Sequence, residues 1–299
     1  RRNFDKGILY QFISMLLAVA AAWVAPHTNE PLFQQFTVAG LVMLLTAIIF
    51  KNPRKWDRVQ IEKHTPDLVV ISLAIIPALL AIKIGVAIDI ENFDLALYGS
   101  IPLLGFLLGA IFLKETIGCG LVFGFLVAIG GIFAIDSCVI TCWDEVFDAE
   151  TIPLACTSLL LVVALLFVKR SEKVHWVAIL IYISIPITVV SPLLVWWFDT
   201  YSPLSWTSFG YILLSAILIT ASLVFLIKSL QKIDLLLNLP MMYLAIAVTT
   251  LTQGMGGYLK VAGVCATLIG VGTMVFAKEN QIKAKISDLK DAEASYHAY

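Results

Sequence analysis

The sequence is short of charge. Asp, Glu, Lys and Arg make up only 14% of its 299 residues, whereas hydrophobic residues make up 60%. Soluble domains average about 25% charged residues. The mean hydropathy is +0.93, and the apolar residues come in long runs rather than in alternating stripes, a pattern that needs lipid as the solvent. The lack of charge therefore excludes an ordinary soluble domain and indicates an all-α integral membrane protein.

The sequence also lacks the motifs of common catalysts and cofactor sites. It has no Walker A sequence for ATP, no HExxH motif and no His-rich tract, so we expect no cofactor and no metal. The formal net charge of -1 gives no reason to expect a nucleic-acid partner. Cys138 and Cys142 share a polar loop and fit either two free thiols or a local disulfide. The histidines are few and are predicted in loops or the tail: His27, His64, His175 and His297.

Ten apolar segments are long enough to cross a bilayer, which takes roughly 17–25 residues. Five lie in the first half of the chain and five in the second. The predicted spans are Gly7–Ala25, Leu32–Phe50, Leu68–Ile88, Leu95–Leu113, Ile117–Ile135, Ile152–Val168, Val174–Phe198, Ser208–Ile227, Leu235–Leu251 and Tyr258–Ala277.

The basic residues support this count independently. Cytoplasmic loops of membrane proteins collect Lys and Arg. With ten spans and a cytoplasmic amino terminus, 18 of the 20 basic residues fall on the cytoplasmic side, and Lys83 and Lys260 are the exceptions. The opposite loops are acidic. A miscount by one span would scramble this alternation, so the sequence predicts ten spans with both termini inside.

An internal repeat divides the chain. Pro102 is followed thirteen residues later by Glu115, and Pro240 is followed thirteen residues later by Gln253. A glycine-rich helix follows each pair, and its glycines are again seven apart in both copies, as Gly124 and Gly131 and as Gly263 and Gly270. We interpret these glycines as close-packing surfaces, within the chain or between two copies.

Five spans in each repeat make the two repeats lie in the membrane upside down to each other. We expect one repeat over residues 1–140, an inverted one over 141–277 and a cytoplasmic tail over 278–299. Inverted repeats are a recurring plan of secondary transporters, in which the substrate site lies near the midplane between the halves.

The run SIPLLGFLLGAIFLKETIGCGLVFGFLVAIGGIFAI resembles the carboxyl half of an EamA-type repeat of the drug/metabolite transporter superfamily. That repeat has a Pro in its fourth helix, a Glu where this helix ends and a glycine-rich fifth helix. The matching residues are Pro102, Glu115, Gly124 and Gly131. The second copy matches through Pro240, Gly263 and Gly270, but it carries Gln253 where the repeat more often has Glu. The resemblance implies a ten-helix transporter with a central cavity, and it implies no particular substrate.

Ionisable residues inside a membrane are costly, by roughly 2.5–3.5 kcal/mol on insertion scales, so each needs a reason. Lys83 in the third span is either a cation facing the cavity or a side chain that snorkels to the outer headgroups. Asp89 and Asp94 belong to an acidic group at the outer mouth, which fits proton coupling or, more often, a solvated loop. Glu115 is a third coupling candidate, although a carboxylate at a helix end more often caps the next helix.

Polar residues around the two prolines are our candidates for the cavity. A Pro in a span frees a backbone carbonyl, which a polar side chain or a ligand can satisfy. The candidates beside the prolines are Tyr98, Ser100, Asn238 and Tyr243. The first and eighth spans add Gln11, Ser14, Trp23, Ser215, Thr220 and Ser222. The alternative is that the hydroxyls bond their own helices and that the aromatic residues sit at the interfaces.

The function that these features favour is a secondary transporter or facilitator for a small metabolite such as an amino acid, a sugar, a nucleotide-like molecule or an organic cation or drug. Its expected partners are the lipid bilayer and the substrate, and it is expected to be a monomer or homodimer. The charge asymmetry fits a bacterial inner membrane best. A scaffold or receptor without transport is one alternative, and a lipid-modifying enzyme is another, although the latter needs acids or histidines gathered at one interface.

Overall fold

The computed structural model describes residues 2–24, 32–51, 58–87, 93–135, 151–197, 205–253 and 258–296. Within these ranges all regular structure is helical, as expected, and no strand occurs. The elements are α1 (Arg2–Val24), α2 (Leu32–Ile49), α3 (Arg58–Ala87), α4 (Phe93–Phe112), α5 (Cys119–Ile135), α7 (Thr151–Arg170), α8 (Trp176–Trp197), α9 (Trp206–Leu230), α10 (Leu235–Asn238), the 3-10 turn η3 (Pro240–Met242), α11 (Tyr243–Gln253) and α12 (Tyr258–Tyr296).

Helical structure is found at each of the ten predicted segments, and the ninth of them is interrupted. Judged by length and composition over the described residues, five helices are able to cross a membrane, namely α1, α3, α8, α9 and α12. Four shorter apolar stretches lie in α2, α4, α5 and α10–α11. The chain is therefore a helical membrane protein.

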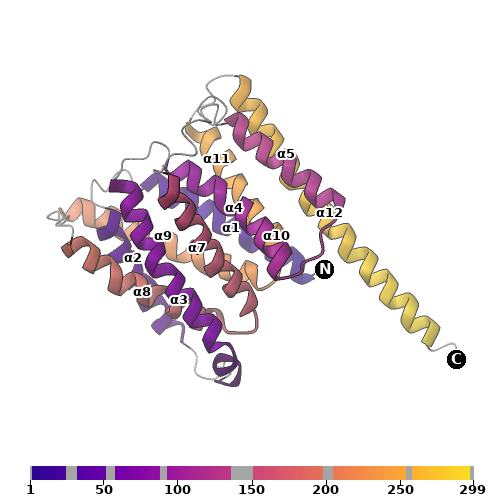
Figure 1. Cartoon of the computed structure of the whole chain (residues 1–299), viewed down its shortest axis with the longest axis horizontal. Helices are drawn as coiled ribbons and strands as arrows, with labels where there is room; N and C mark the ends of the chain where they lie inside the picture. The colour runs from indigo at the N-terminus through magenta and orange to yellow at the C-terminus, as the bar shows by residue number, and fades with distance from the viewer. Residues whose placement is uncertain are drawn as a thin grey trace.

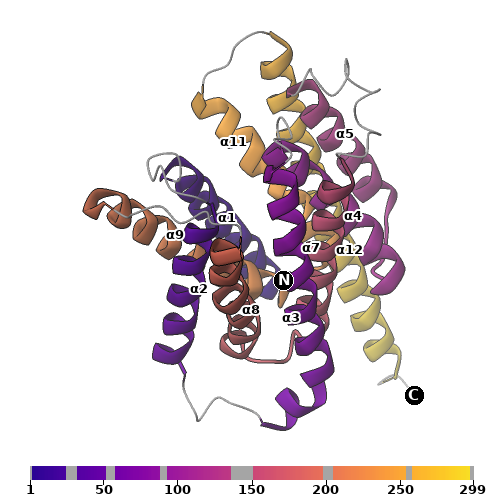
Figure 2. The same ribbon diagram turned by 60° about the vertical axis from the view of Figure 1, so that its left-hand side comes forward.

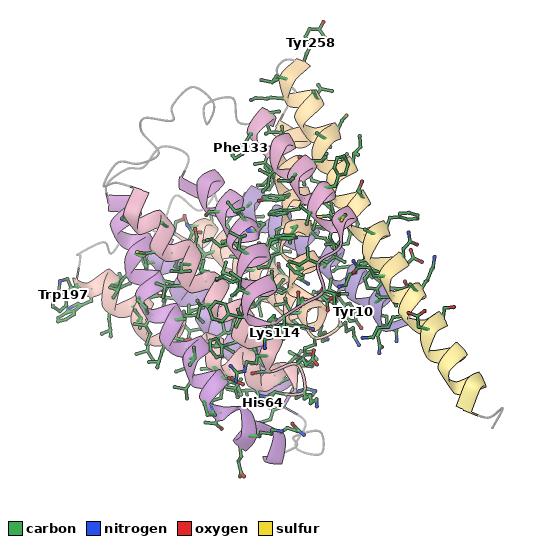
Figure 3. The ribbon with its side chains drawn as sticks, turned by 45° about the vertical axis from the view of Figure 1, so that its right-hand side comes forward. Tyr10, His64, Lys114, Phe133, Trp197 and Tyr258 are labelled. Carbon is green, nitrogen blue, oxygen red and sulfur yellow. The ribbon has the colours of Figure 1, made fainter. Side chains whose placement is uncertain are left out.

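Helix α3 begins ten residues before the predicted third span and carries charged residues on its first turns. His64 lies in this helix, so its prediction as a loop residue was wrong. Its Nδ1 lies 3.1 Å from Oδ2 of Asp67, and Nε of Arg170 in α7 lies 3.5 Å from Oδ1 of the same carboxylate. These interactions with Asp67 hold the polar end of α3 in place, and a hydropathy pattern does not register them. Figure 3 shows His64 far from Trp197, which projects from the end of α8.

The helices pack in pairs that join the two halves of the chain. Helix α1 runs along α9, α3 along α7, α2 along α8, and α5 along α12 (Figures 1 and 2). Smaller contacts join α3 to α8 and α2 to α9. Each of these contacts pairs a helix before residue 140 with a helix after it, so packing between the halves builds much of the bundle.

Buried apolar side chains form two clusters. One lies mainly among α2, α3, α7 and α8 and includes Ile71, Val162 and Ile179. The other lies mainly among α4, α5 and α10–α12 and includes Phe125 and Met274. Large apolar side chains are also exposed on most helices, as expected for surfaces that face lipid.

The contact between α5 and α12 runs through the predicted glycines. A Cβ added at Gly124 would meet the carbonyl oxygen of Gly270 at 2.6 Å, and one added at Gly131 would meet that of Gly263 at 2.6 Å. The earlier glycine of one helix faces the later glycine of the other, so the two helices run antiparallel. The interpretation of these glycines as a close-packing surface is confirmed, and the surface joins two helices of one chain.

Helix α12 continues without a break from the predicted tenth span through the predicted tail to Tyr296. The predicted cytoplasmic tail over 278–299 is thus helical as far as Tyr296 and prolongs the predicted tenth span. The lower end of α12 projects beyond the other helices (Figure 1). Cys138 and Cys142 lie outside the described residues, whereas the cysteines at 119, 156 and 265 are free and exposed.

Candidate functional site

The ninth predicted span is broken at Pro240. Its first piece, α10, ends at Asn238, and the chain then tightens into the 3-10 turn before α11. Because Pro240 has no N–H, the helical hydrogen bond to the Leu236 carbonyl is lost. The N–H of Met242 donates to the carbonyl of Leu239 at 2.8 Å, one residue short of the helical position, which releases the carbonyl of Asn238.

A side chain from the first helix satisfies the released carbonyl. Nε2 of Gln11 in α1 donates to the Asn238 carbonyl oxygen at 3.2 Å. Nδ2 of Asn238 donates to Oγ of Ser229 at 2.7 Å, and this hydroxyl donates to the carbonyl of Gly7 at 2.8 Å. We call Gln11, Ser229 and Asn238 the Asn238 cluster. All three residues are at most 1% exposed. The cluster therefore fastens the broken span to α1 and α9.

Ser14 and Ser222 tie α1 to α9 two helical turns away from the contact of Ser229 with Gly7. Oγ of Ser14 donates to the Ser222 carbonyl at 2.8 Å, and Oγ of Ser222 donates to the Ser14 carbonyl at 2.8 Å. The two oxygens lie 3.2 Å apart. These cavity candidates are thus brought together, and their hydroxyls bond each other's backbone.

Glu115 lies in the segment between α4 and α5 and bonds the start of α10. Its Oε1 accepts the N–H of Leu235 at 2.9 Å, and its Oε2 accepts the N–H of Leu236 at 2.8 Å. Capping by Glu115 is confirmed, but the expected helix was wrong, since the carboxylate caps α10 rather than the adjacent α5. Local sequence spacing favours the next helix, whereas here the tertiary fold brings a distant helix start closer.

The backbone geometry of Lys114 directs Glu115 toward α10. Lys114 has a φ of 52°, and it is the one non-glycine residue with positive φ in the described part of the chain. This left-handed conformation follows the end of α4, where it commonly terminates a helix. Figure 3 shows Lys114 on the segment that leads away from α4. The turn places the next residue, Glu115, against the second half of the chain.

Burial raises the pKa of Glu115 above its ordinary value of 4.5. Desolvation is the largest cause, and the two backbone N–H bonds from Leu236 and Leu235 oppose it. The neighbouring carboxylate of Asp234 also raises this pKa. Asp234 itself pairs with the ammonium of Lys278, which lies in α12. The start of α10 is thus held by a loop of the first half and by the last helix.

Two other candidates flank the two prolines, Ser100 before Pro102 and Tyr243 after Pro240. Oγ of Ser100 in α4 lies 2.6 Å from Oγ of Ser158 in α7, so the hydroxyls share a hydrogen bond. Tyr243, at the start of α11, is 1% exposed, and its ring lies 6.3 Å from that of Phe125. Phe125 in turn stacks on Phe106 at 4.1 Å. Tyr243 therefore belongs to an aromatic stack between α11, α5 and α4.

Each remaining candidate either lies apart from these contacts or has a side chain outside the described part of the structure. Trp23 is 51% exposed. Lys83 lies in α3, and Asp94 and Tyr98 lie in α4, but their side chains are outside the described part of the structure. Asp89 is outside the described residues altogether.

Sequence reasoning missed Ser229. The predicted eighth span ended two residues earlier because Lys228 begins a basic stretch, so Ser229 was assigned to a loop. The signal that would have found it is its spacing from Ser222 and Ser215, which lie seven and fourteen residues earlier on the same helix face.

The comparisons with known proteins bear on the fold. No family model and no curated protein matches the sequence. Among the matching solved chains is a protein of known crystal structure that is 16% identical, with a TM-score of 0.69 over 92% of this chain and 98% of that chain. At this identity the likeness shows a shared fold over nearly the full length of both chains.

Proposed function

We propose that this protein is a secondary transporter or facilitator that moves a small metabolite across a membrane by alternating access, and that it belongs with the EamA-type drug/metabolite transporters that its repeats resemble. The observation that carries the proposal is the break at Pro240 inside the bundle. Irregular backbone at membrane depth is tolerated where it is buried in protein or lines a water-filled path, and broken helices form the substrate sites of many transporters.

The packing between the halves supports two inverted repeats. Inverted repeats are related by a two-fold axis that lies in the membrane plane. In order along the chain, this axis superimposes α1 on α7, α3 on α9, and α5 on α12. The contact of α1 with α9 then corresponds to that of α7 with α3, and the α5–α12 contact maps onto itself. Both expected correspondences match observed pairs. The reciprocal glycine contacts fit the same axis.

In this scheme the polar ties at the start of α10 close one face of the bundle. The Asn238 cluster joins α10 to α1 and α9. Glu115 joins it to the segment after α4, and Asp234 joins it to α12. Because cytoplasmic loops collect Lys and Arg, the basic loops predict that this end faces the cytoplasm. Opening toward the cytoplasm would require these bonds to break, while matching bonds form at the start of α4 on the outer side. Figure 2 shows α11 between the α1–α9 pair and the α5–α12 pair.

Flux measurements test the proposal. Purified protein is screened by thermal shift against amino acids, sugars, nucleosides and organic cations, since a ligand that binds the folded state raises the melting temperature. Stabilising compounds are then offered as radiolabelled solutes to proteoliposomes. We expect uptake that saturates and that a substitution at Asn238 reduces. Absence of flux across the panel, in vesicles that contain folded protein, would count against transport.

Topology mapping tests the ten-span arrangement separately. Single cysteines are placed in the stretches 51–63 and 136–150 of a cysteine-free variant and labelled in intact cells with a membrane-impermeant maleimide. We expect labelling of the second stretch only. Labelling of both stretches from one side would contradict the inverted repeat.

A further inference from the structure

The hydrogen bonds of the Asn238 cluster fix the orientation of both of its amides. Ser229 has one hydroxyl proton and donates it to the Gly7 carbonyl, so it must accept a hydrogen bond from Asn238. Nδ2 of Asn238 therefore faces Ser229, and Oδ1 faces away. The backbone carbonyl of Asn238 only accepts, so Gln11 must present Nε2 to it, which leaves Oε1 on the other side.

Both amide oxygens remain without a hydrogen-bond partner among the described residues. Oε1 of Gln11 and Oδ1 of Asn238 are fully buried, in residues that are 1% and 0% exposed. A buried acceptor without a hydrogen-bond partner destabilises the fold, so a pair of them in one hydrogen-bonded cluster needs a reason.

The surroundings favour positive charge at these oxygens. Ser229 lies in the last turn of α9, and the carboxyl end of a helix carries a partial negative charge. The basic residue of that turn, Lys228, has its ammonium over the rings of Trp176 and Phe225. The carboxylate of Glu115 bonds the N–H of Leu236, two residues before Asn238. The ammonium of Lys278, which reaches the start of α10, is engaged by Asp234.

We infer that Gln11 Oε1 and Asn238 Oδ1 form a binding site for a small cationic group, either a sodium ion or the ammonium group of a solute. Carbonyl and amide oxygens are ligands for both, and unwound segments of broken membrane helices coordinate cations in transporters. Binding of a solute's ammonium group rests on the proposed transport function, because the transported solute would then be a primary amine. The sodium source does not depend on which solute is carried.

Thermal unfolding of the purified full chain tests the site without any transport step. The melting temperature is measured at constant ionic strength while sodium chloride or methylammonium chloride replaces choline chloride, whose bulky cation serves as the reference. We expect one of the two small cations to raise the melting temperature and to saturate. Stabilisation by sodium identifies a metal-ion site, whereas stabilisation by methylammonium alone identifies a site for a solute amine.

Three substitutions locate the effect. Gln11→Leu and Asn238→Leu each remove one acceptor oxygen and are expected to abolish the saturable shift. Asn238→Asp keeps an oxygen at the same place and adds a negative charge, although it loses the hydrogen bond that Nδ2 donates to Ser229. We therefore expect cation binding to become about tenfold tighter. Gln231→Leu is the matched control, because Gln231 also donates from Nε2 to a carbonyl, that of Val174 at 2.7 Å, but lies outside the cluster.

Two results would overturn the inference. One is equal melting temperatures in sodium, methylammonium and choline for both the wild type and Asn238→Asp. The other is a cation effect of wild-type size in both Gln11→Leu and Asn238→Leu. If one leucine variant does not fold, Asn238→Asp alone tests the site. Cation binding that is tighter than in the wild type supports the site, and unchanged cation binding refutes it. Cation binding without solute flux would refute transport alone, and flux without cation binding would refute this site alone.

Discussion

The carboxylate of Glu115 and the backbone N–H of Leu236 meet at 2.8 Å although 121 residues separate them in the sequence. Leu235 shares the same carboxylate through its other oxygen. A residue at the end of the fourth predicted span therefore caps the start of the ninth. This bond connects the two proposed repeats at one end of the bundle, and the first two predictions concern it.

Glu115 should make stability depend on pH in a defined direction. Its pKa is raised in the folded chain, so the folded state holds the proton more tightly than the unfolded state does. The stability that this residue contributes is complete below its ordinary pKa and is lost as the pH rises through the folded value. We expect the melting temperature of the wild type, relative to that of Glu115→Gln, to be highest near about pH 4 and to fall toward neutrality. A difference that grows with pH would contradict the direction of the shift.

Exchanging the acid and the amide between the repeats should shift the conformational balance. Gln253 occupies the position that corresponds to Glu115, but a glutamine has a single, uncharged acceptor oxygen and cannot offer a separate oxygen to each of two neighbouring N–H groups. The proposed cytoplasmic closure is then stronger than the outer one. We expect Glu115→Gln to increase the inward-open population, and adding Gln253→Glu to increase it further, measured as distances between spin labels at positions 64 and 232. Unchanged distance distributions in both variants would contradict this asymmetry.

Replacing a glycine of the α5–α12 contact should destabilise the protein, whereas replacing a neighbouring glycine outside the contact should not. A Cβ at Gly131 would lie 2.6 Å from the Gly263 carbonyl oxygen, whereas one at Gly130 meets nothing within 4 Å. Overpacking of this kind typically costs about 1–3 kcal/mol. We expect Gly131→Ala to lower the melting temperature in detergent. Gly130→Ala, the matched control, should raise it slightly, because alanine is the better helix former by roughly 0.5–1 kcal/mol. Equal effects of both changes would place the helices further apart than described.

Ser14 and Ser222 should contribute nearly independently to the α1–α9 contact. Each hydroxyl gives its only proton to the other residue's carbonyl, so no proton is left for the 3.2 Å contact between the two oxygens. Hydrogen bonds between membrane helices average about 0.6 kcal/mol. We expect Ser14→Ala and Ser222→Ala each to reduce the free energy of unfolding by about that amount and to be additive in the double variant. Ser184→Ala, which removes a bond to its own helix, is the control and should have a smaller effect.

The left-handed conformation of Lys114 predicts which residues can stand before Glu115. A φ of 52° is strained for a residue with a Cβ and especially so for a β-branched one. We expect Lys114→Val to lower stability by about 1–2 kcal/mol and Lys114→Asn to be tolerated, measured by thermal unfolding. The double variant Lys114→Val, Glu115→Gln should lose less stability than the sum of the losses in the two single variants, because the turn positions that carboxylate. A fully additive pair would indicate that the turn and the carboxylate act separately.

The helices and the glycine contact were predictable because each depends on a pattern within one short segment. Long apolar runs locate α1 or α8 whatever surrounds them, and the glycines seven residues apart mark one helix face. The partners of polar groups were not predictable in this way. Ser14 and Ser222 were both recognised as polar residues inside spans, yet only the packing of α1 along α9 makes them partners. The capping of α10 by Glu115 likewise depends on how the two halves meet.

The break at Pro240 was predictable in kind but not in detail. The sequence indicates that this proline frees a backbone carbonyl, and the structure identifies the carbonyl as that of Asn238 and the donor as Gln11. The choice depends on the 3-10 turn at Met242, which moves the unpaired carbonyl along the chain. The local sequence therefore predicts that a backbone carbonyl is unpaired, whereas the packing of α1 determines which side chain bonds it.

Helix α12 is one continuous rod of 39 residues, which at 1.5 Å per residue measures about 58 Å. Its first half packs against α5, and its far end extends past the bundle. A small tilt of the packed part must therefore swing the free end through a much larger arc, as the tip of a pointer moves further than its pivot. A fluorophore near Tyr296 would then register motions of the buried helices that are too small to follow at their source.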